Sequence, residues 1–140
     1  MELLFNNTKM ESGIFQWKVK IDNLASWIAV GVSTHEVVSS KRFNAFIYHF
    51  EPHHSSLMSH NGRTWSLDLN ENDGKNGFKF TKGSELELEM NCNTQQLTIR
   101  KVGSGEFVTF KQVELPVYPS IALHSPNDSV SFYNNVFLQK

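Results

Sequence analysis

The sequence predicts an all-β domain, built as a two-sheet antiparallel, jelly-roll-like β-sandwich. Three observations indicate this fold class. Apolar and polar residues alternate with a period of two over much of the chain. About ten such short segments recur, separated by turn signals every 8–12 residues or so. No stretch shows the longer apolar period of an amphipathic helix.

Four strands are predicted in the first half of the chain. In the first, residues 15–21, Phe15 and Trp17 alternate with polar residues, which indicates one solvated face. Residues 27–32 form a continuous apolar run that ends in Gly31-Val32, as is typical of a strand covered on both sides. The other two strands are residues 46–48 and residues 64–67, which follow the tight-turn pair Asn61-Gly62.

A hairpin is the clearest feature of the second half. Leu86, Leu88 and Met90 alternate with glutamates, and residues 91–96 then turn the chain into a return strand at residues 97–100. A second turn, Gly103-Ser104-Gly105, leads to a strand at 107–110, and Pro116 and Pro119 bracket residues 117–118. The closing strands are 121–123 and 130–132, joined by a turn at 125–128. Without a repeat or linker, one domain spans residues 1–140, with its core at about 12–132.

Composition narrows the classes of partner. The net charge is −1, the pI is about 6.6, and lysines and arginines are scattered, which argues against a nucleic-acid or anionic-membrane surface. No apolar run approaches membrane-spanning length. The single cysteine, Cys92, cannot form an internal disulfide, and no apolar signal segment opens the sequence. We therefore expect a cytoplasmic protein, monomeric and without a cofactor.

Several segments occur in an order that matches a known family. Residues 12–19 hold a glycine before an aromatic-rich strand, 29–33 contain Gly-Val, and 82–86 place a glycine before the hairpin. Residues 118–123 then set a proline before a strand, and 130–132 supply the closing hydrophobic pair. Together they resemble the SPRY domain, a concanavalin-like sandwich. Lys18 and Ser84 stand where that family usually has Glu and Asp, so the chain looks like a divergent member.

The resemblance implies a non-catalytic protein-interaction module that recognises a peptide or protein partner, as in target-recognition domains of ubiquitin ligases or in signalling scaffolds. It implies that loops at one end of the sandwich form the binding face. Carried over by position, that face comprises Thr34, His35, Arg42, Phe43, His124, Ser125, Pro126 and Asn127, with Asn7 and Thr8 beside them. An aromatic side chain beside a guanidinium, as at Arg42-Phe43, is typical of binding hot spots.

Two other function classes remain open. Because lectins use the same sandwich, the second is a glycan-binding module, although no acidic calcium site or exposed aromatic platform is evident. The third is a glycoside hydrolase using Glu85, Glu87 and Glu89. Side chains at i and i+2 lie about 6.6 Å apart, near the roughly 5–5.5 Å of a retaining carboxylate pair. The next strand offers only Thr98 and Arg100 as neighbours, which favours a solvated strand face.

Metal and thiol chemistry are also disfavoured. The histidines of interest are His49, His53, His54 and His60. Adjacent side chains such as His53 and His54 point apart in extended chain, and Cys92 is remote in sequence, so a zinc site is not expected. Cys92 has no adjacent base and is expected to be a structural thiol. The three tryptophans, Trp17, Trp27 and Trp65, lie within predicted strands, where core packing is expected.

Overall fold

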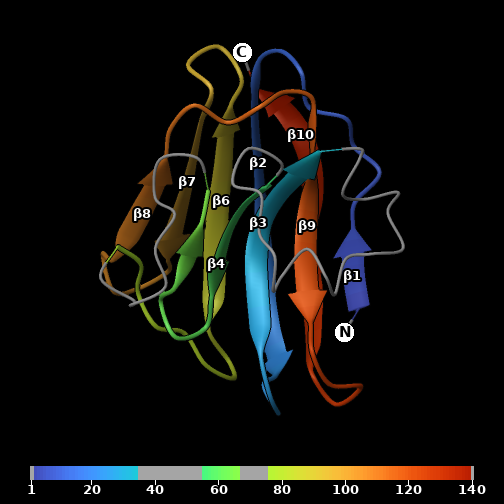
Figure 1. The fold of residues 1–140 in the computed structure, drawn as a ribbon, viewed down its shortest axis with the longest axis vertical. Helices are drawn as coiled ribbons and strands as arrows, with labels where there is room; N and C mark the ends of the chain where they lie inside the picture. The colour runs from blue at the N-terminus through green and yellow to red at the C-terminus, as the bar shows by residue number, and fades with distance from the viewer. Residues whose placement is uncertain (1, 35–54, 67–75, 140) are drawn as a thin grey trace.

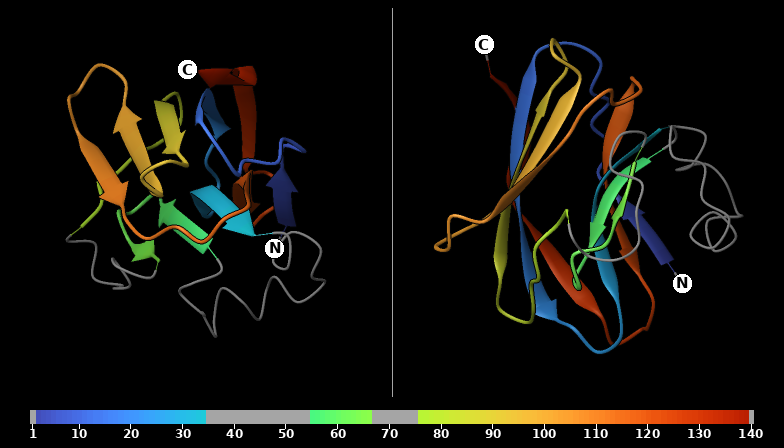
Figure 2. Two further views of the ribbon diagram at one scale, coloured as in Figure 1. Left: turned by 90° about the horizontal axis from the view of Figure 1, so that it is seen from above. Right: turned by 60° about the vertical axis from the view of Figure 1, so that its left-hand side comes forward.

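The computed structural model describes residues 2–34, 55–66 and 76–139, and within these ranges every regular element is a β-strand. The described residues form ten strands in two five-stranded antiparallel sheets, which pack face to face as two layers (Figures 1 and 2). The predicted two-sheet antiparallel sandwich is therefore confirmed. Among the described residues there is no helix with the length and apolarity needed to cross a membrane.

The two sheets interleave in sequence. The first sheet contains, in spatial order, β1 (Glu2–Phe5), β9 (Val117–Leu123), β3 (Ile28–Thr34), β4 (Ser55–Ser59) and β5 (Thr64–Trp65). The second sheet contains, in spatial order, β10 (Ser129–Gln139), β2 (Ile14–Asn23), β6 (Glu85–Asn91), β7 (Gln96–Lys101) and β8 (Phe107–Phe110). Consecutive strands therefore lie in different sheets at β1–β2, β2–β3, β5–β6, β8–β9 and β9–β10.

Most predicted strands are found, with small changes of extent. The two segments at residues 117–118 and 121–123 merge into the single strand β9, and the strands β1 and β4 were not predicted. The strand predicted at residues 46–48 lies outside the described residues. The return strand and the second turn of the predicted hairpin are present as β7 and the β7–β8 connection.

The core lies between the facing sheets. From the second sheet, alternate side chains of β2 and β6 point inward, and Trp17 at 2% exposure is the largest fully buried side chain. The first sheet supplies Ile28, Val30 and Val32 from β3 to the same cluster. Burial of Trp17 and the predicted register of β2 are therefore confirmed. Cys92 also lies in this cluster, where burial and then the carboxylate of Glu11 raise the pKa of its thiol.

The first sheet is buried on its outer face as well. All seven residues of β3 are buried, as the apolar run predicted, and the face away from the core carries Ala29, Gly31 and Ser33. Backbone approaches closely at this face, because a Cβ added to Gly31 would lie 1.9 Å from the carbonyl oxygen of Ser56. Trp65 is buried too, and its ring meets that of half-buried Trp27 edge-on, with centroids 5.9 Å apart.

Candidate partner-binding surfaces

Of the predicted binding residues, those that the structure describes do not converge at one end of the sandwich. β3 and β9 are antiparallel, with Ile28 opposite Leu123 and Thr34 opposite Val117. Thr34 and the turn at residues 124–127 thus lie at opposite ends of the same strand pair, about 20 Å apart at the usual rise per residue. The expectation of a single face was therefore wrong for these residues, since the antiparallel register separates the start of β3 from its end. Thr34 is, moreover, buried.

The N-terminal polar residues accompany Thr34 instead. The backbone N–H of Asn6 donates to the carbonyl of Pro119, and Met10 forms an isolated bridge with Val117. Thr8 is held nearby, since both its N–H and its hydroxyl donate to Oδ1 of Asn6. Of the other predicted contacts, His35, Arg42 and Phe43 lie outside the described residues.

At the end of the sandwich opposite Thr34, one buried carboxylate forms hydrogen bonds with two neighbouring loops. Asp128, at 3% exposure, accepts hydrogen bonds from four backbone N–H groups. Ala25 and Ser26 donate to Oδ1, and Trp27 and Ser125 donate to Oδ2. These donors belong to the β2–β3 and β9–β10 connections, each of which joins one sheet to the other. This role of Asp128 was not predicted from the sequence.

The hydrogen bonds set the charge state of Asp128. Burial alone would raise the pKa of its carboxyl, but the N–H donors of Ser26, Ser125, Trp27 and Ala25 together outweigh burial and hold the pKa below its usual value. The carboxylate is therefore ionised at neutral pH. Its fixed geometry holds His124, Pro126 and Asn127 as an exposed rim.

One pair on this rim resembles a catalytic dyad in composition only. The hydroxyl of Ser26 and Nδ1 of His124 share a hydrogen bond of 2.7 Å. In a serine hydrolase, a carboxylate would orient the imidazole. Here Asp128 gives its oxygens to backbone N–H groups, and no hydrogen bond joins it to His124 among the described residues. The arrangement suits a rigid loop surface rather than a nucleophile.

The second sheet presents a polar outer face. Glu85, Glu87 and Glu89 are half-buried and alternate with the buried residues of β6. Their partners on β2 are Lys20, Lys18 and Gln16, and the side chain of Gln16 donates to Glu89 at 2.7 Å. On β7, Thr98 and Arg100 stand opposite Glu89 and Glu87, as predicted. The three glutamates therefore occupy a charged ladder whose flanking positions carry no aromatic side chain.

An apolar patch adjoins this ladder at the turn between β7 and β8. Phe107 is 62% exposed and Val102 is 47% exposed, and they are the exposed large hydrophobic residues among those described. Arg100 pairs with Phe107 in the β7–β8 register, so both point outward while Ile99 and Val108 point into the core. We call Arg100, Val102 and Phe107 the β7–β8 patch.

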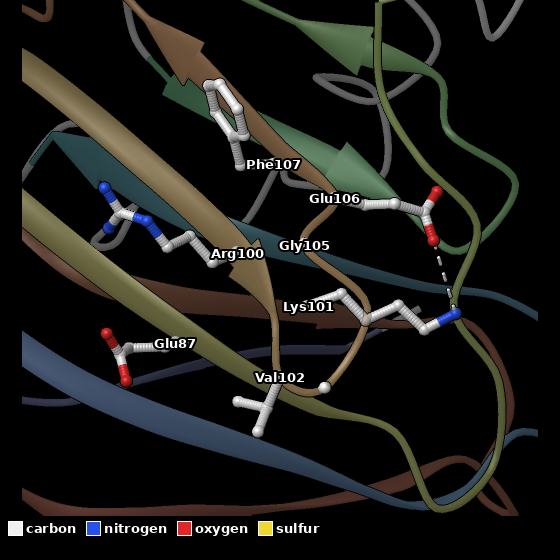
Figure 3. Close-up of a pocket in the computed structure, with 8 residues that line it drawn as sticks. Glu87, Arg100, Lys101, Val102, Gly105, Glu106 and Phe107 are labelled. Carbon is white, nitrogen blue, oxygen red and sulfur yellow. Dashed lines mark ion pairs between the residues drawn. The ribbon is translucent and has the colours of Figure 1, made fainter.

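The patch borders a shallow hollow of about 340 Å³. Glu87, Lys101, Glu106 and the two turn glycines, Gly103 and Gly105, complete its lining. Figure 3 shows two separate groups of charges. Lys101 and Glu106 point toward each other at 4.0 Å, and Lys101 also donates to the carbonyl of Lys79, whereas Arg100 and Glu87 extend to the other side.

Sequence reasoning missed this surface. The segment Phe107-Val108-Thr109-Phe110 has large apolar residues at both odd and even positions, so periodicity alone did not identify its outward face. Pairing with β7 resolves the ambiguity, since Ile99 opposite Val108 fixes the inner face.

A metal site is not formed by the described residues. Among them, no three His, Cys, Asp or Glu side chains are grouped closely enough to hold an ion. His49, His53 and His54 lie outside the described ranges. His60 is half-buried just after β4 and packs edge-on against Phe80, with ring centroids 6.5 Å apart.

Comparison with known proteins identifies the fold. No protein-family profile matches the sequence, and no curated protein matches it. Solved structures do match. The SPRY domain of human HERC1 superposes with a TM-score of 0.74 at 19% identity, covering 94% of this chain and 81% of that one. The PSpry domain of TRIM65 gives a TM-score of 0.67 at 13% identity, covering 95% and 71%. The chain has the SPRY-domain fold, which confirms the resemblance predicted from sequence.

Proposed function

We propose that this chain is a non-catalytic protein-interaction module and that the β7–β8 patch is part of its binding surface. The observation that carries the proposal is the exposure of Phe107 and Val102 beside Arg100. Exposed aromatic and arginine side chains in contact range are the composition of interface hot spots. The similarity in fold to SPRY domains supports the same class of function, and recruitment for a ubiquitin ligase or a scaffold remains a proposal within it.

The test compares partner capture by the parent domain and by patch variants. The isolated domain is used as bait in extract from its own cells, and captured proteins are quantified by mass spectrometry. We expect one or more proteins to be retained by the parent and lost with Phe107→Ala. A matched control is Asn93→Ala, since Asn93 is exposed at the β6–β7 turn, at the far end of that hairpin. If Phe107→Ala retains the same proteins in the same amounts as the parent, the β7–β8 patch is not part of the binding surface.

The loop rim at residues 124–127 is a second proposed contact surface in the same module. Its support is the rigidity that Asp128 gives to exposed His124, Pro126 and Asn127. The variants His124→Ala and Asn127→Ala, used as bait alongside Phe107→Ala, separate the two surfaces. Loss of one set of proteins with the rim variants and of another set with the patch variant would indicate two partners.

The non-catalytic part of the proposal has its own test. The glutamates of β6 are flanked by Lys18, Lys20, Thr98 and Arg100 rather than by aromatic sugar platforms. We therefore expect no reducing sugar to be released from a panel of β-glucans. Turnover that disappears in Glu85→Gln or Glu89→Gln would establish a glycosidase instead.

A further inference from the structure

The charges around the β7–β8 patch are unequally compensated. Lys101 is neutralised by Glu106 and also holds the carbonyl of Lys79. Across the strands, Lys18, Glu87 and Arg100 lie in one row. One carboxylate thus stands between two cations, and among the described residues the guanidinium of Arg100 forms no ion pair. This row lacks one negative charge.

The apolar members of the patch lie beside that cation. Phe107 is the cross-strand neighbour of Arg100, and Val102 follows Arg100 by two residues at the end of β7. Cross-strand neighbours have Cβ atoms about 4.5–5.5 Å apart. A ligand that covers Phe107 and Val102 therefore brings its adjacent groups within reach of the guanidinium, which binds carboxylates bidentately.

The size of the patch selects the kind of ligand. Eight residues line the hollow. A standard protein–protein interface uses roughly 20–30 residues on each side. A short segment fits this area, whereas a second copy of the chain held through this patch alone would bury too little surface for a stable dimer.

We propose that the β7–β8 patch binds a short segment of a partner protein in which an Asp or Glu adjoins a large apolar residue. This inference rests on the proposed function. The carboxylate pairs with Arg100 and brings the row of Lys18, Glu87 and Arg100 to neutrality. The apolar side chain covers Phe107 and Val102 and is removed from water with them. Acid and apolar side chain together are the recognition element.

The experiment uses short random peptides displayed on phage and selected on the folded domain. Enriched peptides are synthesised with a fluorescent label, and their affinity is measured by anisotropy. We expect enrichment of a carboxylate beside a large apolar residue. Phe107→Ala is expected to weaken binding about 30-fold, and Arg100→Gln about tenfold. Lys82→Gln is the matched control, because Lys82 is an exposed cation outside the hollow.

A charge exchange tests the ion pair directly. Arg100→Glu should abolish binding of the acidic peptide, and a peptide with lysine in place of its acid should recover binding to this variant alone. Raising the salt concentration should weaken the acidic peptide's binding to the parent, because a solvent-exposed ion pair is screened.

The outcomes separate this inference from the proposed function. If captured proteins are lost with Phe107→Ala but retained with Arg100→Gln, the proposed interaction module is supported. The proposal that the bound segment carries an Asp or Glu is then refuted. Enrichment of peptides without a carboxylate, or of none, would also overturn it. Concentration-dependent dimerisation in analytical ultracentrifugation that disappears with Phe107→Ala would make the occupant a second copy and overturn it as well.

Discussion

The two sheets differ in how many of their faces are buried. In the first sheet β3 is buried along its whole length, including Ala29 and Ser33 on the face away from the core. In the second sheet β6 alternates strictly between buried and half-buried residues. The difference follows the side chains, because small residues line the outer face of β3 and long charged residues line that of β6. Among the described strands, β6 therefore has an outer face that solvent reaches, whereas the outer face of β3 is closed.

This contrast separates stability from binding within one small domain. Changes on the inner face of either sheet, or on the outer face of the first, should destabilise the fold. Changes on the outer face of the second sheet should leave the fold intact and alter only binding. The predictions below test that division.

The largest effect is expected for Trp17→Ala, which empties the largest fully buried site of the core. Loss of a buried large aromatic costs about 3–5 kcal/mol in the free energy of unfolding. The matched control is Lys18→Ala, the next residue of β2, which points to the outer face and should change stability by about 0.5 kcal/mol or less. Both values come from urea denaturation. An unchanged midpoint for Trp17→Ala would refute the register of β2.

Gly31→Ala tests the closed outer face of the first sheet. The new Cβ would lie 1.9 Å from the carbonyl oxygen of Ser56 on β4, so the strands must separate, and we expect a loss of about 3 kcal/mol. Gly103→Ala is the control for backbone strain alone. Gly103 has φ of +87° with nothing within 4 Å of the added atom, so about 1–2 kcal/mol is expected. Equal losses in thermal or urea unfolding would show that strand contact at Gly31 contributes nothing.

Asp128→Asn tests the hydrogen bonds by which Asp128 links the β2–β3 and β9–β10 connections. An asparagine keeps one acceptor oxygen but turns an NH₂ group toward the N–H donors of Trp27 and Ser125, and we expect a loss of about 2 kcal/mol. The lowered pKa of Asp128 fixes the pH dependence. Its contribution is complete above the unfolded value of about 3.9 and disappears as pH falls through the lower folded value.

The control for this variant is Asp22→Asn, at an exposed carboxylate near the end of β2 that accepts a hydrogen bond from the hydroxyl of Ser131 and from no backbone N–H group among those described. That substitution should change the free energy of unfolding by about 0.5 kcal/mol or less. If Asp128→Asn unfolds at the same urea concentration as the parent, the β2–β3 and β9–β10 connections do not depend on the buried carboxylate.

The sequence was sufficient for what depends on local pattern. Period-two alternation identified β2 and β6 with the correct inward faces, and the unbroken apolar run of β3 indicated burial on both sides. The sequence was insufficient for features that depend on which strands pair and in which register. The separation of Thr34 from His124 follows from the register of β3 with β9, which no local pattern encodes. Asp128 was missed because three of its four partners are backbone N–H groups about a hundred positions earlier in the chain.

The smallest predicted effect concerns His60, a half-buried titratable side chain that follows β4 in the first sheet. Burial lowers the pKa of its imidazole, and the nearby carboxylate of Asp128 acts in the opposite direction. The unfolded chain therefore binds a proton at His60 more readily than the folded one. Stability should fall as pH drops through the unfolded value of about 6.5, and the loss should end once pH passes below the folded value.

Urea denaturation between about pH 5 and 8 measures this slope. In His60→Gln the slope should be shallower than in the parent by the contribution of one histidine, whatever the other histidines add to both. In Asp128→Asn the slope near neutrality should instead steepen. Removing the carboxylate that favours the imidazolium lowers the pKa of His60 further, so protonation opposes folding more strongly. Parallel slopes for the parent and His60→Gln would mean that the ring of His60 reaches solvent despite its packing on Phe80, and that this end of the first sheet is open like the outer face of the second.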